Sequence, residues 1–273
     1  MSATPFFKMT GSGNDFVMVD GRESPAERWT RPRIAAVCDR RRGVGADGLV
    51  VLTPEGSAVR LVYWNADGSR AALCGNAALC SARLAARLGV APGALVRLLT
   101  DSGAVESRCV GGGDLAEIRL PDAAVPQPVP AVALAEGERA AWLGTVGVPH
   151  FVVLVDDVNA VDVQGRGREL RHHPAAGDAG ANANFVSAPT HSDTAWSIRT
   201  FERGVEGETL ACGTGTVAAA LALAGHCGAI LPLQFRSRGG EALTVNATIG
   251  GEGATDIWLG GQGRLVFHGE WEG

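Results

Sequence analysis

The stretch "ETLACGTGTVAAALALA", residues 208–224, places a cysteine shortly before an apolar run of strong helix formers. Gly213 and Gly215 permit close backbone approach, and Thr214 can help to cap a helix. The sequence therefore predicts that a helix begins at Cys212. The first turn of such a helix offers unpaired N–H groups and the positive end of the helix dipole, which favour an anion and lower the pKa of a neighbouring thiol. A cysteine that fills core space is the alternative.

A second Cys-Gly pair precedes a helical pattern in the first half of the chain. The segment "LCGNAALCSARLAARLG" (73–89) corresponds to "ACGTGTVAAALALAGHCG" (211–228), and "NDFVMVD" (14–20) corresponds to "PHFVVLVD" (149–156). The two correspondences fall at nearly the same offset along the chain, which indicates a duplicated unit. Core filling does not explain two cysteines at matching helix starts, so we favour a catalytic role for both.

Short β-rich runs alternate with helical segments in the first half. Strands are predicted at 15–20, 48–52 and 59–64, and helices at 31–41 and 74–89. Together with the repeat, this order indicates two similar halves that mix strands and helices.

The proline-rich segment "PDAAVPQPVPAV" (121–132) is the candidate domain boundary. We expect an N-terminal half, residues 1–120, that carries Cys74, and a C-terminal half, residues 121–273, that carries Cys212. A return of the last strand to the first half is compatible with this division.

Composition and charge exclude several classes of function. The chain of 273 residues has a net charge of −5 and 5% aromatic residues, and its one basic cluster, 40–42, is short. We therefore expect no nucleic-acid partner. The longest apolar run, 217–224, is too short to span a bilayer, and the N-terminal residues lack the apolar core of a signal peptide. These features predict a cytoplasmic protein without a membrane partner.

The spacing of cysteine and histidine argues against a metal site. The six cysteines contain no C-x-x-C pair, and His172 and His173 lack a carboxylate or thiol at ligand spacing. The segment "GVGADG" (43–48) fits the G-x-G-x-x-G pattern of dinucleotide-binding turns. A predicted helix precedes it and a predicted strand follows, which is the reverse of the Rossmann order. We expect reduced thiols, no metal and no dinucleotide.

Two thiols that face one anion site suit the inversion of a stereocentre next to a carboxylate. One group must remove the α-proton from one face while the other delivers a proton to the opposite face. One sulfur is then a thiolate and the other a thiol at any moment, so the pair titrates as a coupled unit. Helix N–H groups and dipoles would hold the carboxylate as its charge grows.

Six segments, in this order along the chain, carry a family resemblance: "FKMTGSGNDF" (7–16), "DRRRGVGADGL" (39–49), "NADGSRAALCGN" (65–76), "PHFVV" (149–153), "NANFV" (182–186) and "FERGVEGETLACGTG" (201–215). With them the chain resembles the diaminopimelate epimerase family, pyridoxal-independent amino acid epimerases and racemases of lysine and peptidoglycan-precursor biosynthesis. The resemblance implies an α/β (α+β) fold of two halves, each a strongly curved, barrel-like sheet around a central helix, related by pseudo-twofold symmetry. It also implies an isomerase that needs no cofactor, acts on a small amino acid and forms a homodimer.

Carried over by position, the resemblance implies catalytic roles for four residues: Cys74, Cys212, His150 and Glu202. The two thiols would exchange protons with the α-carbon of LL- or meso-2,6-diaminopimelate, and the other two residues would tune that exchange. Further positions match substrate-binding residues: Asn14, Asn65, Gly75, Asn76, Asn182, Glu202, Arg203, Gly213 and Thr214. At the distal end of the substrate, Arg203 suits a carboxylate and Glu202 an ammonium group.

Three positions depart from the family pattern. Val148 stands where many members have an asparagine, and Ala77 and Leu79 stand where a glycine and an arginine are usual. These departures leave open a racemase or epimerase of the same family with another amino acid as its substrate. A cysteine hydrolase and a small-ligand binding protein are more remote alternatives, because neither explains the second cysteine.

Overall fold

The predicted β-rich runs form strands in the computed structural model of the chain, which describes residues 3–90, 95–190, 193–251 and 253–273. The strands predicted at 15–20, 48–52 and 59–64 are present with slightly wider bounds. The helix predicted at 31–41 ends at Cys38. It ends there because Asp39 takes an extended conformation and its carboxylate accepts hydrogen bonds from the backbone N–H groups of Arg41 and Arg42.

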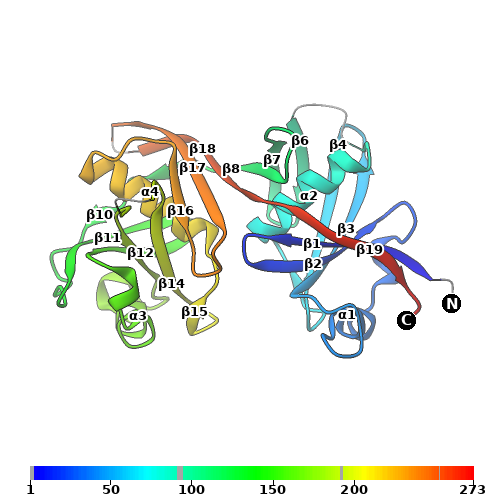
Figure 1. Ribbon diagram of the computed structural model, residues 1–273, viewed down its shortest axis with the longest axis horizontal. Helices are drawn as coiled ribbons and strands as arrows, with labels where there is room; N and C mark the ends of the chain where they lie inside the picture. The colour runs from blue at the N-terminus through cyan, green and yellow to red at the C-terminus, as the bar shows by residue number, and fades with distance from the viewer. Residues whose placement is uncertain (1–2, 91–94, 191–192, 252) are drawn as a thin grey trace. The chain divides into compact units, whose positions relative to one another are not determined.

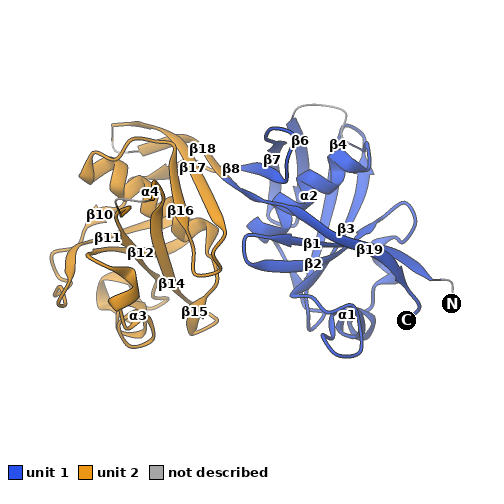
Figure 2. Cartoon of the chain, in the orientation of Figure 1, with its two compact units in different colours: residues 1–119, 260–273 blue, residues 120–259 orange. Residues whose placement is uncertain are grey.

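The chain forms two compact units, coloured separately in Figure 2. Unit 1 comprises Met1–Arg119 and Gly260–Gly273, and unit 2 comprises Leu120–Leu259. Unit 2 is therefore continuous in sequence, whereas unit 1 is completed by a segment that follows unit 2.

Unit 1 contains nine strands and two α-helices in its described residues. The strands are β1 (Thr4–Gly11), β2 (Asn14–Asp20), β3 (Gly48–Glu55), β4 (Ala58–Asn65), β5 (Arg70–Ala71), β6 (Leu95–Thr100), β7 (Gly103–Cys109), β8 (Leu115–Leu120) and β19 (Arg264–Trp271). The helices are α1 (Arg31–Cys38) and α2 (Gly75–Arg87), with a short 3-10 turn at Ala26–Arg28.

Unit 2 contains ten strands, the last of which runs on into unit 1, and two α-helices in the part of the chain that the structure describes. The strands are β9 (Ala123–Ala124), β10 (Gln127–Pro128), β11 (Glu138–Val146), β12 (Val148–Val155), β13 (Asn182–Ser187), β14 (Trp196–Glu202), β15 (Gly207–Thr209), β16 (Leu233–Arg236), β17 (Ala242–Gly250) and β18 (Gly253–Gln262). The helices are α3 (Val163–Arg171) and α4 (Gly213–Cys227), with 3-10 turns at Val158–Ala160 and Pro174–Ala176.

The two units repeat one strand topology. In unit 1, β1 pairs antiparallel with β2, β2 pairs parallel with β3, and β4 pairs antiparallel with β3 and β5 and parallel with β6. In unit 2 the same relations join β11 to β12, β12 to β13, and β14 to β13, β15 and β16. The duplicated unit indicated by the sequence is confirmed at this level, and α2 and α4 occupy equivalent places in the order.

Each long helix lies among the strands of its own unit (Figure 1). In unit 1, α2 contacts β1, β2, β3, β4, β6 and β7, and in unit 2, α4 contacts β11, β12, β13 and β17. Both helices are buried nearly all round, and the nine residues 215–223 of α4 are all buried. A helix with this burial needs small and apolar side chains on every face, which explains the alanine-rich sequence that precedes each C-terminus.

The strands are also covered on the face that points away from the central helix. In β2, Val17 and Val19 are fully buried and form a cluster with Ile34 of α1. In unit 2, Leu170 of α3 forms the equivalent cluster with Phe185 and other residues of β12, β13 and β14. Burial on both faces makes the central parallel pairs rigid. Within the described ranges, no helix is long and apolar enough to cross a membrane.

Candidate functional site

Both cysteines of the repeated Cys-Gly pairs occupy the residue that immediately precedes a central helix. Cys74 precedes α2 with φ −131° and ψ 121°, and Cys212 precedes α4 with φ −130° and ψ 106°. The predicted helix N-terminus at Cys212 is confirmed, and Cys74 has nearly the same backbone conformation. Each thiol therefore stands at the positive end of a buried helix dipole.

In unit 1, two of the predicted binding residues contact each other beside α2. Asn76 donates a hydrogen bond from Nδ2 to Oδ1 of Asn14 over 2.8 Å, and its Nδ2 also reaches the backbone carbonyl of Ser12 over 3.5 Å. Asn14 in turn donates from Nδ2 to Oδ2 of Asp47 over 2.9 Å. This chain of contacts fixes which end of each amide faces its neighbour.

The Asp47 carboxylate that binds Asn14 belongs to a cluster of charged residues. Arg40 binds Asp47 over 2.6 Å and Asp15 over 2.7 Å, and Lys8 binds Asp15 over 2.6 Å. Burial raises the pKa of Asp15, but hydrogen bonds from Arg40 and Lys8 outweigh that effect and lower the pKa to about 2. Asp47, which binds the Asn14 side chain, and its neighbour Asp15 thus lie beside the positive charges of Arg40 and Lys8.

Asn65 lies at the end of β4 and is exposed. Its Oδ1 accepts a hydrogen bond from the Tyr63 hydroxyl over 3.0 Å, and its Nδ2 donates to Oγ of Ser69 over 3.0 Å. Burial raises the pKa of Tyr63, and the charge of Cys74 adds to this effect. Tyr63 therefore lies within electrostatic range of the thiol and contacts a predicted binding residue.

In unit 2, the surroundings of Cys212 differ from the sequence-based expectation. The side chain is 8% exposed, and burial raises the thiol pKa to about 11, with a further increase from the charge of Glu202. The N–H groups of Gly215 and Thr214 and the Thr214 hydroxyl lower the pKa, but they do not outweigh burial. The prediction that the helix N-terminus lowers this pKa is therefore wrong for the net effect, because desolvation is the larger influence. Cys212 carries its proton at neutral pH.

His150 is fully buried on β12 and is surrounded by amide groups. Its Nδ1 lies 3.3 Å from Nδ2 of Asn184 and 3.5 Å from Nδ2 of Asn182. Burial lowers the pKa of His150 to about 4, the Val146 carbonyl opposes this shift, and the charge of Arg203 adds to it. The imidazole is therefore neutral at physiological pH.

Asn182, Glu202 and Arg203 meet where β13 and β14 run side by side. Oδ1 of Asn182 accepts a hydrogen bond from the backbone N–H of Arg203 over 2.7 Å. Burial raises the pKa of the Glu202 carboxyl. Among the residues that the structure describes, the Arg203 guanidinium forms no ion pair, so it is not committed to a structural bridge.

The structure also reveals residues that the sequence reasoning missed. Asp47 anchors Asn14, and Asn184 contacts His150. Thr200 donates from Oγ1 to Oδ1 of Asn184 over 2.9 Å. Asp47 and Asn184 lie within quoted motifs, and Asn184 stands two residues after Asn182, which places both side chains on one face of β13. The two-residue spacing from Asn182 was the sequence signal that could have identified Asn184.

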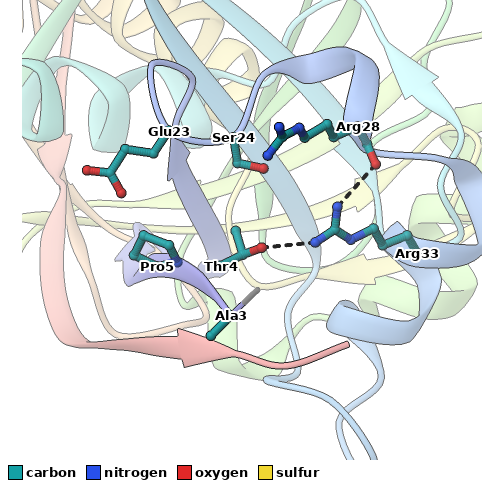
Figure 3. Close-up of a pocket in the computed structure, with 7 residues that line it drawn as sticks. All are labelled: Ala3, Thr4, Pro5, Glu23, Ser24, Arg28 and Arg33. Carbon is teal, nitrogen blue, oxygen red and sulfur yellow. Dashed lines mark hydrogen bonds between the residues drawn. The ribbon is translucent and has the colours of Figure 1, made fainter. Parts of the chain in front are cut away.

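A separate cavity of about 410 Å³ opens in unit 1 near the start of α1 (Figure 3). There, Arg33 donates hydrogen bonds to Oγ1 of Thr4 over 2.9 Å and to the carbonyl of Arg28 over 3.3 Å. None of the predicted site residues lines this cavity. Six of the predicted residues lie at the two helix starts, and the others lie on strands or directly after a strand.

Comparison with known proteins gives one consistent family. The sequence profile of the family described as diaminopimelate epimerase matches residues 6–118 and 143–253. The diaminopimelate epimerase of Gemmatimonas aurantiaca is 44% identical over 284 aligned positions, which cover 97% of this chain and 98% of that protein. The diaminopimelate epimerase of Aquifex aeolicus is 36% identical, with 97% and 96% coverage.

Solved structures show the same fold at low sequence identity. A phenazine biosynthesis protein of the PhzF family from Bacillus anthracis aligns with a TM-score of 0.74 and 15% identity over 99% of both chains. A probable proline racemase from Agrobacterium radiobacter aligns with a TM-score of 0.61 and 17% identity, covering 97% of this chain and 92% of that one. The predicted α/β fold class, with curved sheets and few helices, is confirmed.

Proposed function

The chain belongs to the diaminopimelate epimerase family of amino acid isomerases, and from that premise we propose that it interconverts LL- and meso-2,6-diaminopimelate by a two-thiol mechanism. Cys74 and Cys212 are the proposed acid/base pair. The observation that carries the proposal is the placement of each thiol directly before a buried central helix in one of two units with the same topology.

The chemistry follows from the needs of an α-proton transfer. In one direction, the thiolate of Cys74 takes the α-proton and the bond electrons pass to the α-carbon and its carboxylate. Cys212 then donates its thiol proton to the opposite face and becomes a thiolate. The roles exchange in the reverse direction. The raised pKa of Cys212 supports its starting state as the proton donor for this direction.

Backbone and amide groups near the thiols are suited to the reacting end of the substrate. The N–H groups at the starts of α2 and α4, at Gly75, Gly213 and Thr214, would stabilise the carboxylate as its charge grows. Asn14 and Asn76 are proposed to bind the same end, because their amides are held in fixed orientations.

Other residues are proposed to bind the distal amino acid group. The Arg203 guanidinium would pair with the carboxylate and the Glu202 carboxylate with the ammonium group. Asn65 and Asn182 would supply amide hydrogen bonds. A partly buried carboxyl with a raised pKa is also able to assist proton exchange at a neighbouring thiol, which supports the second role of Glu202.

The decisive experiment follows the α-proton directly. Purified protein, reduced and dialysed against a chelator, is incubated with LL-diaminopimelate in deuterated water without pyridoxal phosphate or metal. We expect loss of the α-proton signal, incorporation of deuterium and appearance of the meso isomer. Folded, reduced protein that gives no exchange would overturn the proposal, and restoration of exchange by added pyridoxal phosphate would overturn its cofactor-independent form.

A panel of amino acids in the same assay tests the substrate. Val148 lies at the start of β12, at a position where the sequence departs from the family pattern. We expect exchange on diaminopimelate to exceed exchange on lysine, arginine and proline. Exchange confined to another amino acid would keep the racemase chemistry and replace the substrate.

Assembly and location are proposed on family grounds. We propose a cytoplasmic homodimer. Two apolar side chains of β19, Val266 and Phe267, are each 47% exposed, which supports an apolar contact with a second copy. Sedimentation of the wild type and of the double variant Val266→Asp, Phe267→Asp tests this, since a dimer built on β19 becomes monomeric in the variant.

A further inference from the structure

The amide of Asn184 is fixed by partners whose hydrogen-bonding roles are unambiguous. Its Nδ2 lies 2.7 Å from the backbone carbonyl of Phe151, which can only accept a hydrogen bond. The reverse orientation would place two oxygens against each other at that distance. The remaining Nδ2 proton therefore points to the other neighbour of the amide nitrogen, Nδ1 of His150, over 3.3 Å.

The amide of Asn182 is fixed independently and leads to the same atom. Its Oδ1 accepts from the backbone N–H of Arg203, which can only donate. Its Nδ2 consequently faces Nδ1 of His150 over 3.5 Å. Two amide donors, oriented by two different backbone groups, thus approach one imidazole nitrogen.

An imidazole nitrogen that faces two N–H donors must act as an acceptor. A proton on Nδ1 would meet those donors, which favours an unprotonated Nδ1 and a ring proton on Nε2. The Val146 carbonyl is a further acceptor beside the ring, and its hydrogen bond favours a protonated ring nitrogen. The doubly protonated imidazolium is disfavoured because the two donors face Nδ1, in agreement with the lowered pKa of this buried ring.

The Nε2 atom of His150 is buried and lacks a hydrogen-bond partner among the described residues. His150 itself is 0% exposed, so bulk water does not satisfy this donor. A buried N–H without a partner costs free energy, which indicates a role in binding a group with a lone pair.

We propose that Asn184, assisted by Asn182, is a positioning residue that holds His150 as the neutral tautomer with its proton on Nε2, so that His150 serves as a hydrogen-bond donor to an anionic group rather than as a proton acceptor. The tautomer follows from the contacts within unit 2 alone. The catalytic role of this tautomer rests on the proposed function, in which the anionic group is a thiolate or the substrate carboxylate.

Asn184 also connects His150 with the start of α4. Its Oδ1 accepts from Thr200 and packs so closely on Gly215 that a β-carbon there would lie 2.1 Å from this oxygen. The same β-carbon would lie 3.3 Å from Sγ of Cys212. One amide thus fixes the imidazole on one side and touches the first turn of the catalytic helix on the other.

The first test reads the tautomer without turnover. Protein labelled with ¹⁵N at histidine is examined by two-dimensional NMR across pH 5.5 to 8, with the His150 signals assigned by their loss in His150→Gln. We expect one protonated nitrogen, Nε2, and no protonation of Nδ1 across this range. A proton on Nδ1, or an imidazolium at pH 7, would overturn the proposal even if the protein is an active epimerase.

The second test replaces the amide donor by an acceptor of the same shape. Asn184→Asp puts a carboxylate beside Nδ1, which should draw the ring proton to Nδ1 and raise the histidine pKa. Its second oxygen also faces the Phe151 carbonyl, so Tm is measured for this variant, and Asn184→Leu, which removes the donor without adding an oxygen, is the second variant. Thr200→Val removes only the contact to Oδ1, so it should keep the proton on Nε2. Asn246→Asp, at an exposed position on β17, is the matched control for the charge change.

Turnover of these variants separates positioning from simple structural damage. We expect Asn184→Asp to lower kcat by about tenfold or more with KM changed by less than about twofold, and to shift the pH–rate profile. Thr200→Val and Asn246→Asp should keep the wild-type pH profile. An Asn184→Asp protein with the wild-type tautomer and an unchanged profile would overturn the proposed role of Asn184. A wild type with the Nε2 tautomer and no epimerase activity would instead count against the proposed function.

Discussion

Asn76 and Asn14, which are far apart in sequence, are joined by a hydrogen bond of 2.8 Å from Nδ2 of Asn76 to Oδ1 of Asn14. Asn14 is held from its other end by Asp47, which binds Arg40. The orientation of Asn76 beside Cys74 therefore depends on a chain of contacts that begins at a surface arginine. If the amide binds substrate as proposed, its fixed orientation means that it loses little entropy on binding.

Removal of the Asn14 amide tests this chain. In Asn14→Ala, Asn76 loses its shorter hydrogen bond and keeps only the 3.5 Å contact with the Ser12 carbonyl, so we expect kcat/KM for diaminopimelate to fall by about 10- to 100-fold. Steady-state kinetics give the value, with Asn246→Ala as an exposed control. An unchanged kcat/KM would show that Asn14 plays no part in binding.

Single replacement of either thiol distinguishes a two-base epimerase from the alternatives. Cys74→Ser and Cys212→Ser should each lower kcat by a factor on the order of 10³ or more, because a serine hydroxyl is a far weaker acid than a thiol and is hardly ionised to act as a base at neutral pH. Calorimetry should still detect diaminopimelate binding in both variants. Loss of turnover in only one of them would point to a hydrolase-like use of a single cysteine.

The two glycines near the helix starts should respond differently to alanine. A β-carbon at Gly215 would lie 2.1 Å from Oδ1 of Asn184, whereas at Gly75 the nearest atom is Cδ1 of Ile118 at 3.7 Å. Gly215→Ala should therefore destabilise the protein by about 1–3 kcal/mol, despite the better helix propensity of alanine. Gly75→Ala should leave Tm unchanged or slightly higher. Equal melting temperatures for the two variants would contradict the close contact.

The buried histidine predicts a specific pH dependence of stability. The pKa of His150 is about 4 in the folded protein and 6.5 for an unperturbed histidine. Between these values the unfolded chain binds a proton that the folded protein does not, so the free energy of unfolding decreases as pH falls from 6.5 to 4, by about 3 kcal/mol in total. Above pH 6.5 this contribution is constant.

Urea denaturation at pH 7 and pH 4.5 measures that dependence, with His150→Gln as the reference. The wild type should lose more stability than the variant between the two pH values, because the other titrating groups are shared. The same loss in both proteins would mean that folding does not lower the pKa of His150.

Oxidation offers a test of the proposed thiol pair. Two sulfurs that act on opposite faces of one carbon should form a Cys74–Cys212 disulfide in air-exposed protein without substrate. Peptide mass spectrometry should find this linkage, activity should fall in proportion, and a reductant should restore it. Full activity without reductant, and no linked peptide, would count against the pairing.

Local sequence signals predicted the helices that carry the thiols because glycine, alanine and leucine have strong and specific effects on helix starts. The same signals found β2, β3 and β4, whose apolar runs are buried on both faces. The helix at 31–41 was predicted too long, since the role of Asp39 in ending it depends on the side-chain geometry. The twofold relation between the halves stays a prediction.

The chemistry of the site was predictable only in part. The family motifs named Cys212 and His150, but the raised pKa of the thiol comes from burial, which depends on tertiary packing and not on the helix alone. Asn184 was missed because its role depends on the parallel pairing of β12 with β13, which places it beside His150. The spacing of Asn182 and Asn184 places both on one face of β13, but the contact with His150 comes from strand pairing, which leaves no local pattern.

The pairing of the first strand with the last has a consequence for the order in which the chain folds during synthesis. β1 pairs with β19 along its length, from Thr4 opposite Trp271 to Thr10 opposite Arg264. Unit 2, which is continuous, has all its residues once Leu259 has left the ribosome, whereas the first residues to be made must wait for the final strand. The half of the protein that is translated second is therefore the half that is able to mature first, and the edge of β1 needs protection until then.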